Sequence, residues 1–393
     1  MANHPKTEAT RPTHYGFNFQ WMFNWWSGPQ PAEPNERALD FLAEFGFNFV
    51  RIPMDYRFWA RDLAYFLPDR SIWKYICTKV EPYRVPRFLY RRALDSLATV
   101  GLFDIPTEER FWTRHFIYFR PDEITWGSIG RYLAACSARG LHLCLNLHRA
   151  PGYCINRNNL ERYNLWLDKI AQDTFVSIWE QFAERYKGIS NDDLSFDLVN
   201  EPPEIGQYDL TRENHAAVIR RTVAAIRAID PTREIVIDGL AGGNLAMPEL
   251  ADLEVTHSGR GYQPQNVTHY QAPWWPDYKG QPFPCYPGTQ FAGQKWDRDA
   301  LVEFYQPWRD VEAQGVKIHI GEFGCYNKTP NDVALRWFAD LLSVFKEFGW
   351  GYSLWEFEGP FGVVNHGRPG TIYENVKGYP ADRALLDLLV GSR

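Results

Sequence analysis

Short apolar runs alternate along the chain with longer segments whose apolar residues recur at helical spacing. The short runs are rich in Val, Ile, Leu and Phe, which is typical of buried β-strands. Six clear strands are predicted at residues 47–53, 141–148, 194–201, 233–239, 317–324 and 352–358, with two weaker ones at 16–23 and 266–271. Amphipathic helices are predicted between them, at residues 126–140, 174–188, 213–230 and 332–349. The pattern is strand then helix, repeated about eight times.

This repeat indicates an α/β protein in which helical crossovers join parallel strands. About eight repeats favour a closed (β/α)8 barrel, the TIM barrel, over an open doubly wound sheet. No G-x-G-x-x-G follows any predicted strand, which removes the main support for a dinucleotide-binding fold. No Ser/Gly-rich linker divides the chain, so residues 1–393 are predicted to form one domain.

Two segments interrupt the alternation. Residues 58–122 follow the second strand and are rich in Trp, Tyr, Phe, Arg and Pro, and a structureless loop of this length is unusual in a compact domain. We expect an ordered insertion with short helices, for example at 85–101. Residues 271–296 form a Pro- and aromatic-rich loop after the sixth predicted strand. Both are expected to project from the C-terminal face of the barrel, where the loops after the strands build active sites.

The aromatic share of the composition adds one observation. Phe, Trp and Tyr make up 16% of the chain, with 16 Trp, more than a core normally requires. Such side chains suit a core, a protein interface or the apolar face of a sugar ring equally well.

The six cysteines, Cys77, Cys136, Cys144, Cys154, Cys285 and Cys325, are scattered, without a C-x-x-C pair or a cluster with histidine. This spacing favours free, mostly buried thiols over a disulfide framework or a metal site.

Charge and hydropathy restrict the partners. The net charge is −6 and no basic stripe is present, so the electrostatic footprint of a nucleic-acid binder is missing. The first fifteen residues lack the apolar segment of a signal peptide, and no later run has the length of a membrane span. These patterns predict a cytoplasmic protein with no membrane and no nucleic acid as partner.

Two glutamates stand at the ends of predicted strands, Glu201 in "LVNEP" and Glu322 in "IGEFG". In a barrel these strand ends converge on one pit. Two carboxylates facing each other across a pit are what glycosidic cleavage needs, because one protonates the leaving oxygen while the other attacks or directs water. A single strand-end Glu is more often a solvated or capping group, but the joint occurrence favours catalysis.

Other polar residues occupy equivalent strand ends. Arg51 interrupts the apolar run "FVRIP", and a guanidinium inside a barrel needs acceptors that offset its desolvation. It is either a structural ion pair or a group that orients an attacking carboxylate. His148 is either a satisfied core histidine or a site residue, and Asn200 either forms a turn or binds a substrate hydroxyl. The same two interpretations apply to His269, Tyr270 and Trp355.

Four of these segments together resemble a known family. "FDLVNEPP" with Glu201, "HIGEFG" with Glu322, "FVRIP" with Arg51 and "LNLHRAPG" with His148 are similar to the signature segments of glycoside hydrolase family 5, the cellulase-like retaining glycosidases. They follow the family's order and span residues 16–362, nearly the whole chain.

The resemblance implies a role for each matching residue. Glu201 would be the general acid/base and Glu322 the nucleophile. Arg51 would hold Glu322 ionised, and Asn200 would contact the sugar 2-hydroxyl. The remaining expected substrate contacts are His148 and His269 in the cleavage subsite, Trp355 as an aromatic platform, and Tyr270, Trp274, Trp275 and Tyr326. The family implies no metal and no cofactor.

One position departs from the family pattern. The family commonly shows His-x-Tyr on the sixth strand, whereas this chain reads "THYQA" at the segment predicted for it, with His269 followed directly by Tyr270. The tyrosine that touches the nucleophile is then either Tyr270, shifted by one residue, or supplied elsewhere, for example by Tyr326.

The implied chemistry is double displacement on β-glycosidic bonds, with the two carboxyl groups about 5–5.5 Å apart. Because the aromatic insertion at 58–122 could close part of a cleft, we expect an exo-acting or pocket-type enzyme for short β-glucosides or β-linked oligosaccharides. An open-cleft endo-β-1,4-glucanase or β-mannanase is the alternative. A non-catalytic sugar-binding barrel and a metal-dependent sugar isomerase are the lesser rivals, since barrels host many functions.

Overall fold

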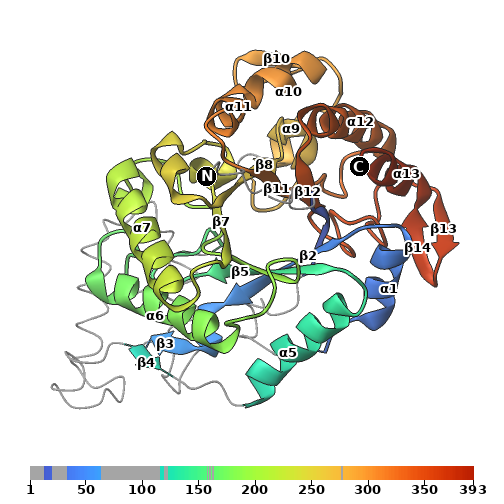
Figure 1. Ribbon diagram of the computed structural model, residues 1–393. Helices are drawn as coiled ribbons and strands as arrows, with labels where there is room; N and C mark the ends of the chain where they lie inside the picture. Colours follow the sequence, from blue (N-terminus) through green and yellow to red (C-terminus); the bar gives the residue numbers. More distant parts are fainter. Residues whose placement is uncertain are drawn as a thin grey trace, which may run out of the picture.

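A closed barrel of eight parallel strands forms the centre of the protein (Figure 1). The computed structural model describes residues 13–19, 33–62, 116–118, 123–156, 158, 161, 163–275 and 278–393. The strands follow one another around the barrel in the order β1-β2-β5-β6-β7-β8-β11-β12, and β12 closes on β1. Their bounds are β1 (Tyr15–Asn18), β2 (Phe49–Asp55), β5 (His142–Arg149), β6 (Leu194–Asp197), β7 (Glu234–Asp238), β8 (Thr256–Gly261), β11 (Ile318–Phe323) and β12 (Gly351–Leu354). The predicted (β/α)8 barrel is confirmed.

Helices surround the barrel as an outer layer (Figure 1). The longer ones are α1 (Glu36–Glu44), α5 (Glu123–Ser137), α6 (Lys169–Arg185), α7 (Arg212–Ile229), α10 (Arg298–Phe304), α11 (Gln306–Glu312), α12 (Asn331–Phe348) and α13 (Arg383–Gly391). Short helical turns are α8 (Leu240–Gly243), α9 (Gln265–Thr268), η1 (Tyr56–Phe58), η4 (Gln207–Asp209), η5 (Pro248–Leu253) and η6 (Tyr278–Gly280). Three small antiparallel sheets pair β3 (Ala60–Asp62) with β4 (Phe116–Tyr118), β9 (Thr289–Phe291) with β10 (Gln294–Trp296), and β13 (Tyr373–Val376) with β14 (Tyr379–Asp382).

Local sequence signals explain where the main helices begin and end. Thr211 caps α7 through a capping box, since its side chain accepts from the backbone N–H of Asn214 while the Asn214 side chain accepts from the cap residue. Gly349 ends α12 in the left-handed conformation, with φ of 71°, which glycine adopts without the steric cost of a Cβ. The predicted helix at 332–349 is thus confirmed to within one residue.

The sixth strand is where the prediction was wrong. The segment 266–271 belongs to α9 and the turn after it, and the strand is β8, Thr256–Gly261. Its sequence "THSGRG" has no large apolar side chain, so it carries no apolar signal. Small residues are required there because a Cβ on Gly261 would lie 2.6 Å from the Cβ of Phe323, and one on Gly259 would lie 3.2 Å from Ile320.

Tryptophans fill the space between the barrel and its helices. Among the described residues, six are almost completely buried: Trp59, Trp166, Trp179, Trp308, Trp337 and Trp350. The ring of Trp179 on α6 lies 5.3 Å from that of Phe196 on β6, and 5.4 Å from Phe182 on its own helix. For these residues the core interpretation of the aromatic composition is the correct one.

The insertion predicted at 58–122 lies mostly outside the described residues, as does the helix expected at 85–101. Its two ends are described: β3 at one end pairs antiparallel with β4 at the other, with Ala60 opposite Tyr118. The segment therefore leaves and re-enters the fold through a two-stranded ribbon. Its order and its place on the C-terminal face stay predictions.

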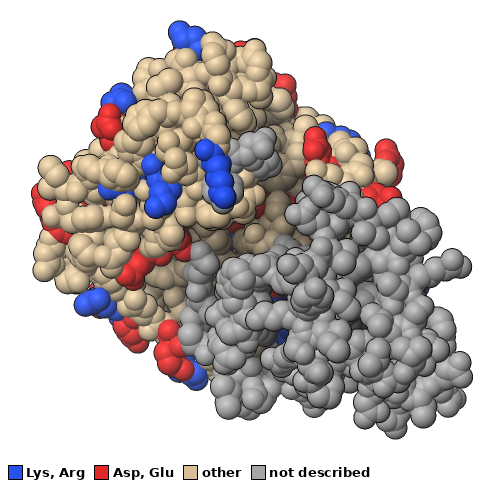
Figure 2. Space-filling model, turned by 180° about the vertical axis from the view of Figure 1, so that it is seen from behind, with Lys and Arg blue, Asp and Glu red and all other residues tan. Residues whose placement is uncertain are grey.

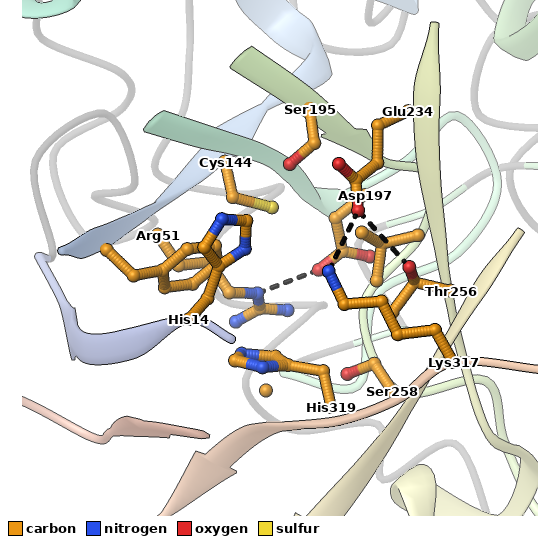
Figure 3. Close-up of a pocket in the computed structure, with 13 residues that line it drawn as sticks. His14, Arg51, Cys144, Ser195, Asp197, Glu234, Thr256, Ser258, Lys317 and His319 are labelled. Atoms are coloured by element: carbon orange, nitrogen blue, oxygen red, sulfur yellow. Dashed lines mark hydrogen bonds and ion pairs between the residues drawn. The ribbon is translucent and has the colours of Figure 1, made fainter. Parts of the chain in front are cut away.

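The barrel interior is polar as well as apolar. A cavity of about 10 Å³ at the N-terminal half of the barrel, at the lower limit for one water molecule, is lined by side chains of most strands (Figure 3). Glu234 contacts Lys317 Nζ at 3.5 Å and accepts from Thr256 Oγ1 at 3.3 Å. Arg51 and Asp197 border the same cavity and connect it to the C-terminal half.

The five cysteines in the described residues are free, and all but Cys285 are buried, as predicted; Cys77 lies outside the described residues. No helix in that part of the chain is long and apolar enough to cross a membrane. On the face in Figure 2, the described Lys and Arg side chains are scattered among Asp and Glu. The cytoplasmic location stays a prediction.

Candidate active site

The two candidate glutamates lie at the C-terminal end of the barrel, one after β6 and the other on β11, with β7 and β8 between these strands. Glu322 is the fifth residue of β11 and is 3% exposed. Glu201 lies four residues beyond the end of β6, and its side chain is 15% exposed. Arg260, on β8, contacts both, with Nε 2.9 Å from Glu201 Oε1 and Nη2 3.4 Å from Glu322 Oε1. The tertiary structure thus brings the two carboxylates to one guanidinium.

Glu322 is held by three donors. Arg51 Nη1 donates to its Oε1 at 2.6 Å, in addition to Arg260. The Tyr262 hydroxyl donates to Oε2 at 3.2 Å. Two cationic donors and a phenol stabilise an ionised carboxylate at this buried position.

Arg51 on β2 is 1% exposed and is surrounded by acceptors. They are Asp197 Oδ2 at 2.7 Å, Glu322 Oε1 at 2.6 Å, Asn18 Oδ1 at 2.9 Å, Asn200 Oδ1 at 2.9 Å and Asp238 Oδ2 at 3.5 Å. Burial alone lowers the pKa of Arg51, but the nearby carboxylates raise it above its ordinary value. Arg51 therefore combines the two predicted roles. It forms a structural ion pair with Asp197, and it also holds the carboxylate of Glu322.

The backbone at Glu201 is held in an uncommon conformation. Its φ is 46°, a left-handed value that a non-glycine residue rarely adopts. The backbone N–H donates to Asp238 Oδ2 at 3.0 Å, and the carbonyl accepts from the Tyr153 hydroxyl. These bonds hold the turn after β6 and fix the direction of the side chain.

Burial, followed by the charge of Glu322, raises the pKa of Glu201 to about 8, although Arg260 lowers it. A carboxyl group with such a pKa is protonated at neutral pH. It can then donate a proton, which is the requirement for a general acid.

Arg260 is completely buried and contacts three carboxylates and an amide. Besides the two glutamates it donates to Asn200 Oδ1 at 2.9 Å and to both oxygens of Asp238. Burial alone lowers the pKa of Arg260, and Asp238, Glu322 and Glu201 raise it well above the ordinary value. We call Arg51, Asp197, Glu201, Asp238, Arg260 and Glu322 the charge cluster.

Asn200 and His148 lie beside the charge cluster. Asn200 Oδ1 accepts from both arginines, which leaves its amide nitrogen 3.5 Å from His148 Nε2. The ring of His148 lies 5.4 Å from the ring of Trp355, with 14° between the planes. Burial, then Arg51 and Arg260, lower the pKa of His148 well below its usual value, so the ring is neutral. The sequence predicted all three residues, and the structure brings them together.

The model of the family described as Cellulase (glycosyl hydrolase family 5) matches residues 120–359. This chain belongs to glycoside hydrolase family 5. Members of this family hydrolyse O-glycosides with retention of configuration, so the chain is an O-glycoside hydrolase with a carbohydrate substrate. The resemblance seen in the sequence motifs is confirmed.

Several proteins are similar to this chain over more than half of its length. A solved structure described as a glycoside hydrolase is 57% identical, with a TM-score of 0.81, and the match covers 97% of this chain and 100% of that one. Endoglucanase C of Acetivibrio thermocellus is 26% identical over 327 residues, 74% of this chain and 90% of the relative. Cellodextrinase A of Ruminococcus flavefaciens is 26% identical over 236 residues, 57% of this chain and 65% of the relative.

The family's sixth-strand tyrosine is Tyr262, which follows β8 directly and touches Glu322. The interpretation of Tyr270 or Tyr326 as that residue was wrong, because it depended on the misplaced strand. The Tyr270 hydroxyl accepts instead from Gln271 at 3.0 Å, and its ring packs 6.3 Å from Phe283. The His-x-Tyr pattern reads Arg260-Gly261-Tyr262 in this chain, so an arginine stands where the family commonly has histidine.

An aromatic wall borders the site on the side of the loop after β8. It consists of His269, Trp274, Trp275, Tyr326 and Phe361. His269 lies 5.2 Å from the ring of Tyr262 and 5.1 Å from that of Trp275. Trp274 is 59% exposed and lies 5.0 Å from Tyr326. The wall connects Tyr262, which contacts Glu322, with an indole that faces solvent.

Sequence reasoning missed several side chains that contact the two candidate glutamates or the arginines beside them. Asp197 and Asp238 were inside predicted strands, as single acids in apolar runs, and this is the signal that could have identified them. Arg260 and Tyr262 carried a signal only in the Arg-x-Tyr spacing, and Tyr153 carried none. In the described residues no group of three or more His, Cys, Asp and Glu is arranged to hold a metal ion; catalysis without a metal stays a prediction.

Proposed function

We propose that Glu201 is the general acid/base and Glu322 the nucleophile of a retaining β-glycosidase. The contrast between their surroundings carries this assignment. Glu322 is held by two arginines and a tyrosine hydroxyl, whereas burial and the Glu322 charge raise the pKa of Glu201 to about 8. A protonated carboxyl group beside a carboxylate that three donors hold in place is the pair that double displacement requires.

In the first step Glu322 attacks the anomeric carbon while Glu201 donates its proton to the glycosidic oxygen. The bond from that carbon to the leaving oxygen breaks, and a glycosyl ester of Glu322 forms. Tyr262 and Arg51 orient the attacking carboxylate. Asn200, whose oxygen both arginines fix, directs its amide nitrogen to the sugar 2-hydroxyl.

In the second step Glu201, now ionised, takes a proton from water. The water oxygen attacks the anomeric carbon, the ester bond breaks, and its electron pair returns to Glu322. The product keeps the β configuration because each of the two displacements inverts it.

We infer that the substrates are short β-1,4-linked gluco-oligosaccharides or β-glucosides. Similarity to a cellodextrinase supports this class. The aromatic wall supports it as well, because a wall on one side of the site narrows the space for a chain. The second candidate is endo-acting cleavage of longer β-glucans, which the similarity to endoglucanase C over 90% of that relative favours.

The test compares two substrate sizes and follows the anomer of the product. Aryl β-cellobiosides and cello-oligosaccharides should be hydrolysed with initial release of the β-anomer, detected by proton NMR. A 2-deoxy-2-fluoro glycoside should add one sugar mass to a peptide that contains Glu322. Rapid loss of viscosity of a soluble β-glucan, with little release of small sugars, would replace the short-substrate proposal by the endo-acting candidate. An α-anomer as first product would overturn the double displacement.

A further inference from the structure

Arg260 departs from the family pattern and lies beside both candidate glutamates. It contacts the acid/base through Nε and the nucleophile through Nη2. Its remaining donors are used by Asp238, Ser258 Oγ at 3.1 Å and Asn200. A guanidinium is a permanent cation with its donors in a rigid fork, so this bridge carries a full positive charge between the two glutamates at every working pH.

The charge on the opposite side of Arg260 changes during the reaction. In the free enzyme Arg260 faces the carboxylates of Glu322 and Asp238 besides Glu201. When the glycosyl ester forms, Glu322 loses its negative charge. The anion that opposed ionisation of Glu201 is then gone, and the cation that favours it remains within 2.9 Å.

We propose that Arg260 is a positioning residue for the second step, in which it stabilises ionised Glu201 as the general base that activates water. The inference depends on the proposed roles of Glu201 and Glu322. Arg260 acts through Glu201 Oε1, which leaves Oε2 to face the substrate oxygen or the water.

The charged neighbours of Glu201 act in opposite directions, and Glu322 is the one whose charge changes during the reaction. From β11, Glu322 opposes its ionisation only while it is free; from β7, Asp238 opposes it throughout. Arg260 favours ionisation by charge and by a hydrogen bond. Tyr262 and Arg51 contact Glu322 rather than Glu201. When the ester forms, the opposing charge of Glu322 is lost, and the favourable contact of Glu201 with Arg260 remains.

The experiment uses an aryl glycoside that isolates the second step. With a dinitrophenyl β-cellobioside the leaving group needs no proton, so kcat reports hydrolysis of the ester. In Arg260→Gln we expect kcat at pH 6 to fall about tenfold, and the acidic limb of the kcat profile to move up by about one pH unit. A burst of one equivalent of dinitrophenol should precede the steady state, and kcat/KM should fall less than kcat because Arg51 and Tyr262 still hold Glu322. Azide, which attacks without a general base, should restore kcat.

Two matched variants separate this effect from loss of structure. Arg260→Lys keeps the positive charge but not the planar guanidinium, so it should move the acidic limb of the kcat profile in the same direction by less. If Arg260→Gln does not fold, Arg260→Lys serves as the test variant. Arg233→Lys alters a buried arginine at the other end of the barrel, 2% exposed and paired with Asp230 at 2.8 Å. It should lower the melting temperature and leave the burst and the pH profile unchanged.

A fall of kcat and kcat/KM together in the Arg260 variants, with no burst, no shift of the limb and no response to azide, would overturn the proposal. Glu201→Ala in the same assay keeps that result distinct from failure of the proposed function. If Glu201→Ala gives the burst and responds to azide while the Arg260 variants do not, only the role of Arg260 fails. If Glu201→Ala does neither, the assignment of the acid/base fails.

Discussion

The two ends of the barrel interior are both polar, yet they bury charge in different ways. At the C-terminal end, four carboxylates share two arginines, and each arginine contacts at least three of them. At the N-terminal end, a neutral histidine, His142, bonds to Ser195 Oγ at 2.7 Å and to the Asp192 carbonyl at 3.1 Å. Arg233 pairs there with one carboxylate and otherwise donates to backbone carbonyls and to Asn191 Oδ1.

The difference shows what marks a catalytic cluster in a barrel filled with polar groups. At the N-terminal end His142 and Arg233 each have fixed partners. At the C-terminal end the acids outnumber the arginines, so the protonation states are coupled, and burial and Asp238 raise the pKa of Asp197 to about 7. Perturbed acids that share partners are typical of functional sites. Substitutions at the two ends should therefore change different quantities.

The largest effect is expected from Glu322→Gln. The substitution removes the nucleophile but keeps the shape of the side chain, so we expect hydrolysis to fall by about 10⁴-fold or more. The melting temperature should change little by comparison. Steady-state assays with an aryl β-cellobioside and a thermal unfolding scan measure both. An enzyme that keeps more than a few per cent of its activity would rule out Glu322 as nucleophile.

Glu201→Ala should come next, with a loss of about 10²- to 10⁴-fold on substrates with poor leaving groups. Activated aryl glycosides should lose less, because they do not need the acid. In the wild type, kcat/KM should be retained at neutral pH and fall as the pH rises through about 8, since the acid form of Glu201 disappears there. In the variant this basic limb should vanish. Its persistence would assign the limb to another group.

Tyr262→Phe removes one hydrogen bond to the carboxylate of Glu322, the proposed nucleophile. Such bonds are worth about 1.5–3 kcal/mol, so kcat/KM should fall roughly 10- to 100-fold with the fold intact. Tyr270→Phe is the matched control, because its hydroxyl meets Gln271, and it should leave kcat/KM nearly unchanged. If Tyr270→Phe lowered kcat/KM more than Tyr262→Phe, Tyr270 would be favoured as the tyrosine that acts on Glu322.

The smallest effect is expected at the N-terminal end, from His142→Asn, and it concerns stability alone. Burial lowers the pKa of His142 to about 4. The positive charge of Lys317 acts in the same direction, and the negative charge of Glu234 acts against it. The folded state therefore takes up a proton on this ring at a lower pH than the unfolded state does. The wild type should lose about 2 kcal/mol between pH 7 and pH 5 through this group, and the variant should lose less. Urea unfolding at both pH values measures the difference, and equal slopes would contradict the assignment.

Much of the fold and part of the site could be read from residue patterns. The strands at 47–53 and 141–148 were visible because their side chains are apolar and the sheet buries both faces. Arg51, Glu201 and Glu322 stood out because each is a charged residue at or near the end of such a run. The strand β8 could not be predicted because its crowded surroundings leave room only for glycine at two positions, and it therefore has no run of apolar residues. Arg260 and Tyr262 were missed for the same reason.

The sequence by itself determined the barrel, the family and the two candidate glutamates, because apolar period and short motifs are local properties of the chain. Only the tertiary structure decided which residues surround those glutamates. Arg260 and Glu201 are 59 residues apart in sequence, and Arg51 and Glu322 are 271 apart. Such pairs meet only when the barrel closes, and the resulting burial and the charge of Glu322 raise the pKa of Glu201.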